Sequence, residues 1–528
     1  MRDFHMPGRS AAYAANGMAA TSHPVATLTA LDVLRGGGNA VDAAVAAMAV
    51  HCVVEPGMTG IGGDCFVLLA PASGGVVALN ASGRAPAAAT VPHLQELGVD
   101  EIKAESPHAI TVPGAVGGWE LLLGRYGTKG LDELLQPAIR AAEDGFAVTP
   151  RVAFDWARSQ ARLEQSEGAK AFYLPAGKPP GEGRLVRLPA LARTLKKIAE
   201  GGAQAFYTGE LAEKMLVSLK AWGGLHTAQD LAGQRAEIIE PIHTNYRDHR
   251  VYQCPPNGQG VITLMLLNIL EGYELGSMAV TGAERLHLLA EATKLAFRDR
   301  DALLADPARA TVPLDKLLDK AYAAKLRALV EPDRALVDLP PPLLEPHPDT
   351  VYLTVVDKDL NAVSFINSLY DAFGSGRCCA ETGVLFHNRG KSFRLDPTHP
   401  NCIAPGKRPM HTIIPGLAFK GGEVAMAFGV MGGNYQPVGQ AHVLTACIDH
   451  GLDPQAALDL PRTMAYPTDM EVERGVGPVT RAGLQAKGHT IIEPESPLGG
   501  GQMIQIDRKR GVLIGGSDPR KDGLALGY

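Results

Sequence analysis

The sequence predicts an α+β protein, with helices concentrated before residue 350 and strands after it. Residues 130–235 are mostly helical in pattern, and residues 286–301 have the apolar spacing of a long amphipathic helix. After residue 350 the pattern changes to short β-type runs separated by turns. The 528 residues, 46% hydrophobic and 20% charged, are enough for a large core or two closely packed layers.

A helical hairpin is expected close to the N-terminus. Ser22 can cap a first helix that has Pro24 in its opening turn, and this helix should end at the glycines 36–38. Asn39 can then cap a second, alanine-rich helix over residues 40–54. That run is too short to span a membrane and is interrupted by an aspartate and a histidine, so a buried helix is expected.

A glycine-rich turn over residues 55–64, E-P-G-M-T-G-I-G-G-D, precedes the strand-like run 65–70. Its spacing fits neither G-x-G-x-x-G nor the Walker A motif, and the glycines of a dinucleotide site precede a helix instead of a strand. Glycines that let two backbone segments approach closely are therefore expected here, and a phosphate site is not.

A proline-rich segment, residues 331–349, separates the helical part from the β-rich part. Repeated proline prevents helix and favours extended, solvated backbone, so this segment is predicted to be a linker. Thr350 begins a run with period-two alternation that stops at a turn over 357–361, and a second β-type run, 362–370, follows. The two runs are predicted to pair as a hairpin.

Thr350 is a candidate nucleophile because of what a cut before it would expose. A threonine hydroxyl is a weak nucleophile at neutral pH, but a new α-amine, with a pKa of about 7.7–8.0, can take its proton. The chain would then be an inactive precursor until it is cut. A threonine that only begins a strand is the structural alternative.

Three further segments offer groups for catalysis or binding. Gly432 and Gly433 follow a strand-like run, and consecutive glycines there can point two N–H groups at an oxyanion. A tight strand-to-helix turn explains them equally well. Arg84, in N-A-S-G-R-A-P (80–86), and the tract P-G-K-R-P-M-H-T (405–412) offer cationic and hydroxyl groups for a carboxylate. Each is also compatible with a structural role.

Charge and cysteine content exclude several classes of protein. The net charge of -6 is small and there is no basic run, so nucleic acid is not an expected partner. The seven cysteines, including Cys378 and Cys379, show no C-x-x-C spacing, and an odd number argues against a secreted disulfide framework. No apolar signal segment is present at the start. We therefore expect a soluble cytoplasmic protein with reduced thiols, no membrane partner and no metal or organic cofactor.

Taken together, these segments resemble the γ-glutamyltransferase family of N-terminal-nucleophile hydrolases, and the likeness runs along nearly the whole chain. In the first part the motifs are L-R-G-G-G-N-A-V-D-A-A-V-A (34–46), V-V-E-P-G-M-T-G-I-G-G-D (53–64), V-P-G-A-V-G-G-W (112–119) and E-A-T-K-L-A-F-R-D-R-D (291–301). In the last part they are D-T-V-Y-L-T-V-V-D-K-D-L-N-A-V-S (349–364), F-G-S-G (373–376), P-G-K-R-P-M-H-T (405–412), M-G-G (431–433) and G-G-S-D-P-R-K-D-G (515–523).

The resemblance implies a four-layer αββα sandwich, in which two stacked antiparallel sheets lie between helical layers. It also implies self-cleavage between Asp349 and Thr350 into a large subunit, residues 1–349, and a small subunit, residues 350–528. The two fragments would stay together as one intertwined domain and one active heterodimer, with further dimerisation left open. Thr350 would be the nucleophile for self-cleavage and turnover, and its freed amine the base.

The resemblance also implies the groups around this nucleophile. Ser368 stands where the family has a threonine whose hydroxyl bonds the nucleophile, and Gly432 and Gly433 would form the oxyanion hole. His411 and Thr412 fall where the family keeps two serines beside the substrate.

Three substrate-binding positions depart from the family pattern. Arg84 is displaced by two positions from the arginine that meets the substrate's α-carboxylate. Tyr370 and Ser392 stand where an asparagine and an aspartate hold the α-amino group. Losing the aspartate removes the negative partner that a substrate ammonium needs in a desolvated pocket, whereas a nearby arginine still favours a carboxylate.

The chain, notably M-P-G-R-S-A-A-Y (6–13) and F-R-L-D-P-T-H-P-N (393–401), is most similar to the oxamate amidohydrolase branch of the family. Oxamate has a carboxylate next to an amide and no ammonium, which suits these departures. The predicted function is hydrolysis of a small carboxylate-bearing amide, with oxamate giving oxalate and ammonia. Two alternatives stay open: γ-glutamyl transfer or hydrolysis on glutathione-like donors, and a non-catalytic binding protein that retains the fold.

Overall fold

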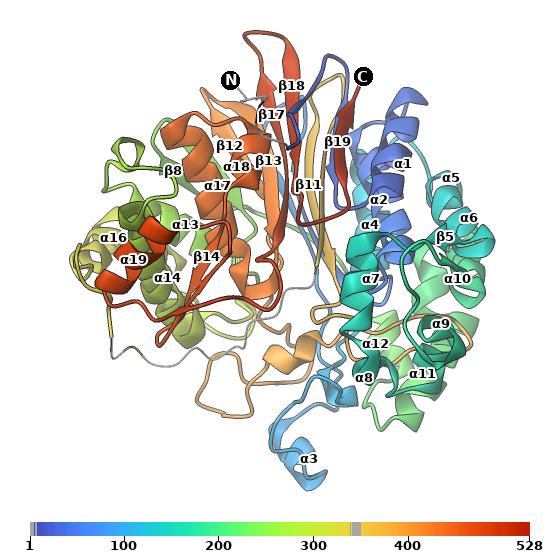
Figure 1. Cartoon of the computed structure of the whole chain (residues 1–528). Coiled ribbons are helices and arrows are strands. Elements are labelled where there is room, and N and C mark those ends of the chain that lie inside the picture. The colour runs from blue at the N-terminus through green and yellow to red at the C-terminus, as the bar shows by residue number, and fades with distance from the viewer. Residues whose placement is uncertain (1–4, 6–7, 338, 340–349) are drawn as a thin grey trace.

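Two stacked seven-stranded antiparallel sheets form the centre of the molecule, and helices cover the outer face of each (Figure 1). The computed structural model describes residue 5, residues 8–337, residue 339 and residues 350–528. The four layers confirm the predicted αββα sandwich. Most of the predicted linker, including Asp349, lies outside the described residues.

The first sheet has the strand order β1 (Ala12–Ala14), β18 (Val512–Ser517), β17 (Gly500–Asp507), β13 (Glu423–Met431), β12 (Gly416–Lys420), β9 (His249–Gln253) and β8 (Ile242–Tyr246). The second has the order β19 (Leu524–Gly527), β2 (Met18–Thr21), β10 (Val351–Val356), β11 (Ala362–Ser368), β3 (Asp64–Ala70), β4 (Val77–Ala81) and β7 (Glu237–Ile239). Each sheet therefore mixes strands from both sides of the predicted cut.

Two helical layers enclose the sheets. Over the second sheet lie α1 (Pro24–Arg35), α2 (Ala40–Val54), α4 (Ala115–Tyr126), α5 (Leu131–Leu134), α6 (Gln136–Asp144), α7 (Pro150–Ala157), α8 (Gln160–Leu163), α9 (Glu167–Tyr173), α10 (Pro189–Tyr207), α11 (Gly209–Ala221) and α12 (Ala228–Ala232). Over the first lie α13 (Gly260–Leu270), α14 (Ala283–Leu303), α15 (Leu314–Leu318), α16 (Lys320–Arg327), α17 (Gln436–His450) and α18 (Pro454–Asp459), and α19 (Pro478–Ala486) packs on α14.

Small elements complete the structure. They are α3 (Val91–Glu96), the β5 (Phe146–Ala147) and β6 (Leu185–Val186) pair, and a sheet of β14 (Thr463–Ala465), β15 (Met470–Val472) and β16 (Ile491–Ile492). A separate apolar core fills the space between the two large sheets and includes Phe66, Tyr352 and Ile504. The burial of both sheet faces explains why β10 and β11 contain long apolar runs.

The predicted helical hairpin is α1 and α2. Asn39 caps α2 as expected, accepting from the backbone N–H groups of Val41 and Asp42, and all of α2 is buried. The predicted cap of α1 is wrong by one residue, because His23 occupies that position. The Ser22 hydroxyl instead donates to the buried carboxylate of Glu55, at 2.6 Å.

The predicted helix over residues 286–301 is confirmed within α14, but almost every face of it is buried. Helices α13 and α19 and strand β14 pack against it on different sides. Its charged residues are therefore paired inside the protein: Lys294 meets Glu291 at 2.8 Å, and Arg300 meets Asp301 at 2.7 Å.

The glycine-rich turn before β3 brings two backbone segments together, as predicted. A Cβ atom on Gly62 would lie 2.1 Å from the carbonyl oxygen of Leu385, and one on Gly63 would lie 2.3 Å from that of Ser368. Only glycine fits at such distances. The turn thus supports the end of β11, where Ser368 lies.

The seven cysteines are all free thiols, five of them buried, which agrees with the expectation of reduced and mostly buried cysteines. Among the described residues, no helix combines the length and apolar character needed to cross a membrane.

Candidate active site

Thr350 lies at the head of β10, and its side chain is fully buried. The register of the β10–β11 hairpin pairs Val351 with Asn367, which places Thr350 opposite Ser368. Their hydroxyl oxygens are 3.3 Å apart, and the side-chain amide of Gln436 donates to Thr350 Oγ1 at 3.4 Å. The structure thus brings together the pair that the resemblance implies.

The turn after β11 is held in a strained conformation. The backbone N–H of Tyr370 donates to Ser368 Oγ at 2.8 Å, and Tyr370 has a φ of +80°, which is unusual for a residue other than glycine. Strain of this kind is maintained only where the surroundings fix it, and it is frequent at active sites. It places the buried Tyr370 ring against the guanidinium of Arg389, 3.8 Å from the ring centroid.

Gly432 and Gly433 follow the last residue of β13 with φ angles of +117° and +53°. The side-chain amide of Gln259 donates to the carbonyl oxygens of Gly433 and Thr412, at 2.9 and 2.8 Å. This buried glutamine joins the glycine turn to the 405–412 tract. The predicted oxyanion glycines and the predicted substrate-binding threonine therefore belong to one connected cluster.

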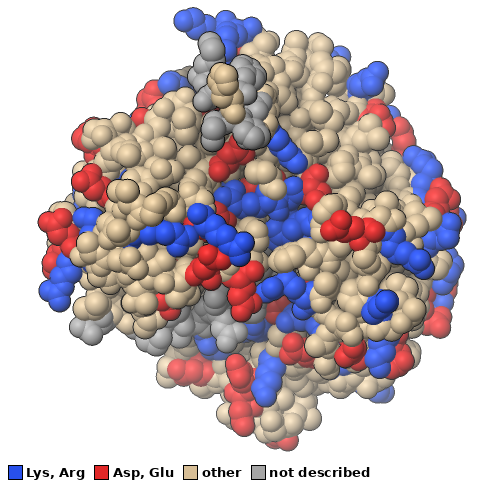
Figure 2. All heavy atoms as spheres, viewed as in Figure 1, with Lys and Arg blue, Asp and Glu red and all other residues tan. Residues whose placement is uncertain are grey.

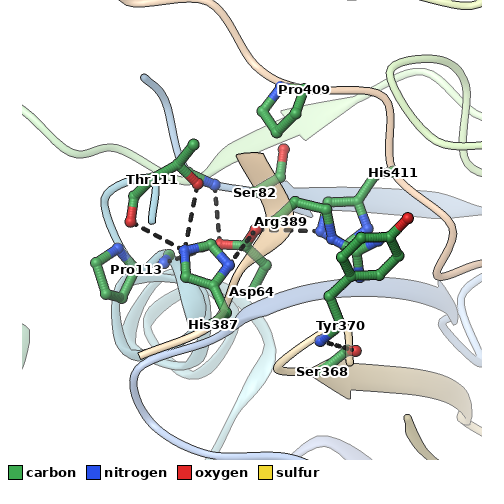
Figure 3. Close-up of polar contacts among 12 residues, drawn as sticks. Asp64, Ser82, Thr111, Pro113, Ser368, Tyr370, His387, Arg389, Pro409 and His411 are labelled. Atoms are coloured by element: carbon green, nitrogen blue, oxygen red, sulfur yellow. Dashed lines mark hydrogen bonds and ion pairs between the residues drawn. The ribbon is translucent and has the colours of Figure 1, made fainter. Parts of the chain in front are cut away.

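Asp64 is the centre of a buried polar network beside this cluster (Figure 3). It accepts hydrogen bonds from the backbone N–H groups of Gly83 and Gly114, at 2.9 and 3.2 Å. His411 Nε2 lies 3.1 Å and His387 Nδ1 3.5 Å from its Oδ2 atom. Burial, reinforced by a nearby arginine, lowers the pKa of His411 to about 3, so this ring is neutral near pH 7.

Arg389 is buried next to the same network. Its Nη1 atom donates to Thr412 Oγ1 at 2.8 Å, while its Nε and Nη2 atoms have no hydrogen-bond partner within the described part of the chain. Burial lowers the pKa of Arg389 to about 10, which still leaves it charged near neutrality.

Two predicted binding residues are engaged elsewhere. Arg84 is 30% exposed and bonds to Glu237 at 2.9 Å and to the carbonyl of Gly406 at 3.1 Å. Ser392 is buried and donates to the carbonyl oxygen of Met410 at 2.8 Å. Ser392 therefore acts in this structure as a link between two backbone segments.

One group of metal-capable side chains occurs in the described residues: His287, Glu291 and His489. The ammonium of Lys294 already pairs with Glu291, and the two histidine rings bond each other at 2.8 Å. The backbone N–H of Leu336 donates to Glu291 at 2.7 Å. The charge of Glu291 is therefore already balanced by Lys294, and the bond from Leu336 holds the start of the predicted linker in place.

Comparison with known proteins decides the family. The family model described as Gamma-glutamyltranspeptidase matches residues 26–528. The chain belongs to this family. It is therefore an enzyme that hydrolyses amide bonds, and the predicted family assignment is confirmed.

Relatives with similar sequence identity to this chain are named for different activities. It is 37% identical to the glutathione hydrolase-like YwrD proenzyme of Bacillus subtilis (strain 168), over 97% of this chain and 98% of that protein. It is 35% identical to the oxamate amidohydrolase proenzyme of Klebsiella pneumoniae subsp. pneumoniae, with the same coverage of each. The crystal structure of a cephalosporin acylase from Bacillus halodurans superposes with a TM-score of 0.93 at 39% identity, over 100% of this chain and 99% of that one.

Five residues of the candidate site were not found from the sequence: Asp64, Gln259, His387, Arg389 and Gln436. Each lies in a segment whose local pattern shows only a strand start, a loop or a helix start. The available signal was an ionisable or amide side chain next to glycines, as in G-G-D and N-R-G-K. That signal does not show which side chain points inward.

Gly432→Ala is expected to lower kcat by roughly 10²–10³-fold, the usual effect of removing one oxyanion donor. The φ of Gly432 is +117°, and a Cβ atom added there would lie 2.9 Å from Cα of Gly499. The backbone at residue 432 would therefore have to rotate, which would redirect its N–H group. The rate is measured on processed enzyme. Gly421→Ala is the control, because its φ is +62° and no atom lies within 4 Å of the added Cβ. Equal kcat values for Gly432→Ala and Gly421→Ala would contradict the predicted role of Gly432 in the oxyanion hole.

Proposed function

We propose that the chain cuts itself before Thr350 and then uses Thr350 to hydrolyse a small carboxylate-bearing amide, with oxamate as the leading substrate. The observation that carries the proposal is the buried contact between the hydroxyls of Thr350 and Ser368 at the head of β10. Family membership supports it and argues against the non-catalytic alternative.

The sheet topology explains how two fragments, residues 1–349 and 350–528, would remain one active unit. Strand β10 pairs with β2 on one side and β11 on the other, and β11 pairs with β3. The fragments would thus share both sheets and the core between them, and separating them would expose that core to water.

Turnover follows from the position of Thr350. After the cut, its α-amine takes the hydroxyl proton while Oγ1 bonds to the amide carbon, and the resulting oxyanion faces the Gly432–Gly433 turn. The C–N bond then breaks, and the same proton leaves with the nitrogen as ammonia. Water attacks the ester, giving its proton to the amine, and the acid leaves as the Thr350 hydroxyl is restored. During self-cleavage the amine is still a peptide nitrogen, so another group is the base.

The contacts of Tyr370 and Ser392 support a substrate without an ammonium group. Ser392 is bonded to the Met410 carbonyl, and the Tyr370 ring is covered by a guanidinium. Neither position supplies a carboxylate. On the face shown in Figure 2, Lys and Arg side chains gather around a hollow near the middle of the molecule, with Asp and Glu side chains at its rim.

The second candidate is γ-glutamyl hydrolysis or transfer, which the name of the 37% identical relative favours. Ammonia release from oxamate and 4-nitroaniline release from γ-glutamyl-4-nitroanilide separate the two on the same processed protein. We expect kcat/KM for oxamate to be higher by at least about 10²-fold, because the γ-glutamyl ammonium would be left unpaired. The reverse order would make the γ-glutamyl interpretation correct.

A further inference from the structure

Arg389 is a buried cation whose hydrogen-bonding capacity is mostly unused. A guanidinium has five N–H donors, yet a single bond, from Nη1 to Thr412 Oγ1, is made among the described residues. We infer that Arg389 binds the carboxylate of the substrate's acyl group. This inference rests on the proposed function and names the group that selects its substrate class.

Other buried arginines of the chain are compensated by the protein itself. Arg462 is in contact with the carboxylate of Asp518, and Arg300 pairs with Asp301 at 2.7 Å. Arg285 has no carboxylate within 4 Å in the described residues, but it bonds to the carbonyl of Val280, the carbonyl of His442 and the hydroxyl of Thr445. Within the described residues Arg389 has no carboxylate within 4 Å and no carbonyl acceptor, and the hydroxyl of Thr412 is its single hydrogen-bond partner. A buried charge left in this state is costly, so an anionic ligand is the natural partner.

The unused atoms of Arg389 have the geometry of a carboxylate site. Nε and Nη2 lie along one edge of the planar guanidinium, and this edge presents two parallel N–H groups to the two oxygens of a carboxylate. The remaining Nη1 atom is held by Thr412 Oγ1, and one face of the plane is stacked on Tyr370. The guanidinium is therefore oriented before a ligand arrives, with its paired donors still available.

Arg389 is also close to the candidate nucleophile through a short series of contacts. Its guanidinium stacks on Tyr370, whose backbone N–H bonds Ser368 Oγ, and that oxygen is 3.3 Å from Thr350 Oγ1. In Figure 3 Arg389, Tyr370 and His411 lie side by side with Ser368 next to them. The inference therefore has the acyl chain of one substrate extend from its carboxylate at Arg389 to its amide carbon at Thr350.

The charges around Arg389 disfavour an ammonium on that acyl chain. The two aspartates that act on its charge are already occupied: Asp64 is bonded by His411 at 3.1 Å, and Asp371 is paired with Arg162 at 3.1 Å. The substrate class is therefore an amide of a short dicarboxylic acid without an α-amino group. Arg84, the arginine expected from the sequence, has its guanidinium bonded to Glu237.

Matched substrates that differ only in the charged group test the inference on processed enzyme. Oxamate is compared with oxamide, and the mono-4-nitroanilide of glutaric acid with its terminal carboxamide. In the wild type we expect a preference for the carboxylate members in kcat/KM. In Arg389→Met the KM for these members should rise roughly 10- to 100-fold, and kcat/KM for the neutral members should fall by a much smaller factor. Arg389→Lys should be intermediate, because a point charge replaces the two-pronged donor.

Binding and control variants complete the test. Oxalate or glutarate should raise the unfolding temperature of the wild type and leave that of Arg389→Met unchanged. Arg377→Met is the matched control, because Arg377 also stacks on an aromatic ring, Trp222, at 5.7 Å, but bonds to the Glu105 carbonyl. It should keep the wild-type preference.

Several outcomes would overturn the inference. The first is a wild type that has no higher kcat/KM for the carboxylate-bearing amides than for the neutral ones. The second is a preference for the carboxylate-bearing amides that persists in both Arg389→Met and Arg389→Lys. The third is a preference that is lost in Arg84→Met but kept in Arg389→Met. Wild-type protein that is uncut, or that turns over none of the four amides, contradicts the proposed function instead.

Discussion

Thr350→Ala should leave one uncut chain that has lost amide hydrolysis. Without the hydroxyl there is no atom at the head of β10 to attack either the peptide bond before residue 350 or an external amide. Ser368 Oγ is 3.3 Å away, but Ser368 lies inside the chain at the end of β11 and so has no free α-amine to act as its base. We expect kcat to fall by at least about 10⁴-fold, as for the loss of other covalent nucleophiles. Denaturing gels and mass spectrometry measure the cut, and ammonia release measures turnover.

Thr350→Ser is the matched control for this experiment. Serine keeps the hydroxyl and the α-amine and removes only a methyl group, so two fragments should still form, the second beginning at residue 350. Wild-type protein that stays uncut and fully active would falsify the proposal. If the Thr350→Ala protein is still cut at the same bond, another residue must be the nucleophile for self-cleavage.

Asp64→Ala should be the most destabilising change in the network beside the site. It would leave the backbone N–H groups of Gly83 and Gly114 and the ring of His411 without their buried acceptor. Each buried donor left without an acceptor costs about 1–3 kcal/mol, so the loss of Asp64 should cost several kcal/mol in total. Asp64→Asn should cost less, because an amide oxygen can still accept from the two backbone groups.

Urea unfolding of the uncut Thr350→Ala chain measures this effect, since unfolding of a single chain does not depend on protein concentration. Asp333→Ala is the control, because its side chain is 98% exposed and its pair with Lys487 is worth at most about 1 kcal/mol. Similar midpoints for Asp64→Ala and Asp333→Ala would show that the network does not stabilise the fold.

The pH dependence gives a second test of Asp64. Burial alone would raise the pKa of Asp64, but His387, His411 and Arg389 outweigh it and hold that pKa below its usual value. The unfolded chain therefore takes up the proton first as the pH falls, at about pH 4. The contribution of the Asp64 charge is present above that pH and is lost below it. The difference in unfolding free energy between the chain that keeps Asp64 and its Asp64→Asn variant should accordingly narrow below about pH 4. A constant difference would contradict the charge argument.

Local patterns in the sequence were sufficient for the elements that carry the site. The α1–α2 hairpin, the buried α2 helix, the β10–β11 hairpin and the closely approaching glycines before β3 were all predicted, because each depends on neighbours a few residues apart. The period-two run after the prolines placed Thr350 at the head of a strand. The order of many motifs along the chain gave the family, and with it the four layers.

The tertiary structure alone decided which charged groups are buried in the candidate site. Arg84 and Arg389 are equally visible as arginines near glycines, yet one pairs with Glu237 at the surface and the other is buried against Tyr370. Asp64 and His411 are 347 residues apart and become partners when β3 meets the 405–412 tract. Hydrophobic periodicity fixes which face of a strand is buried, but the partner of a buried charge depends on contacts between distant segments. Those contacts form only when the two sheets stack.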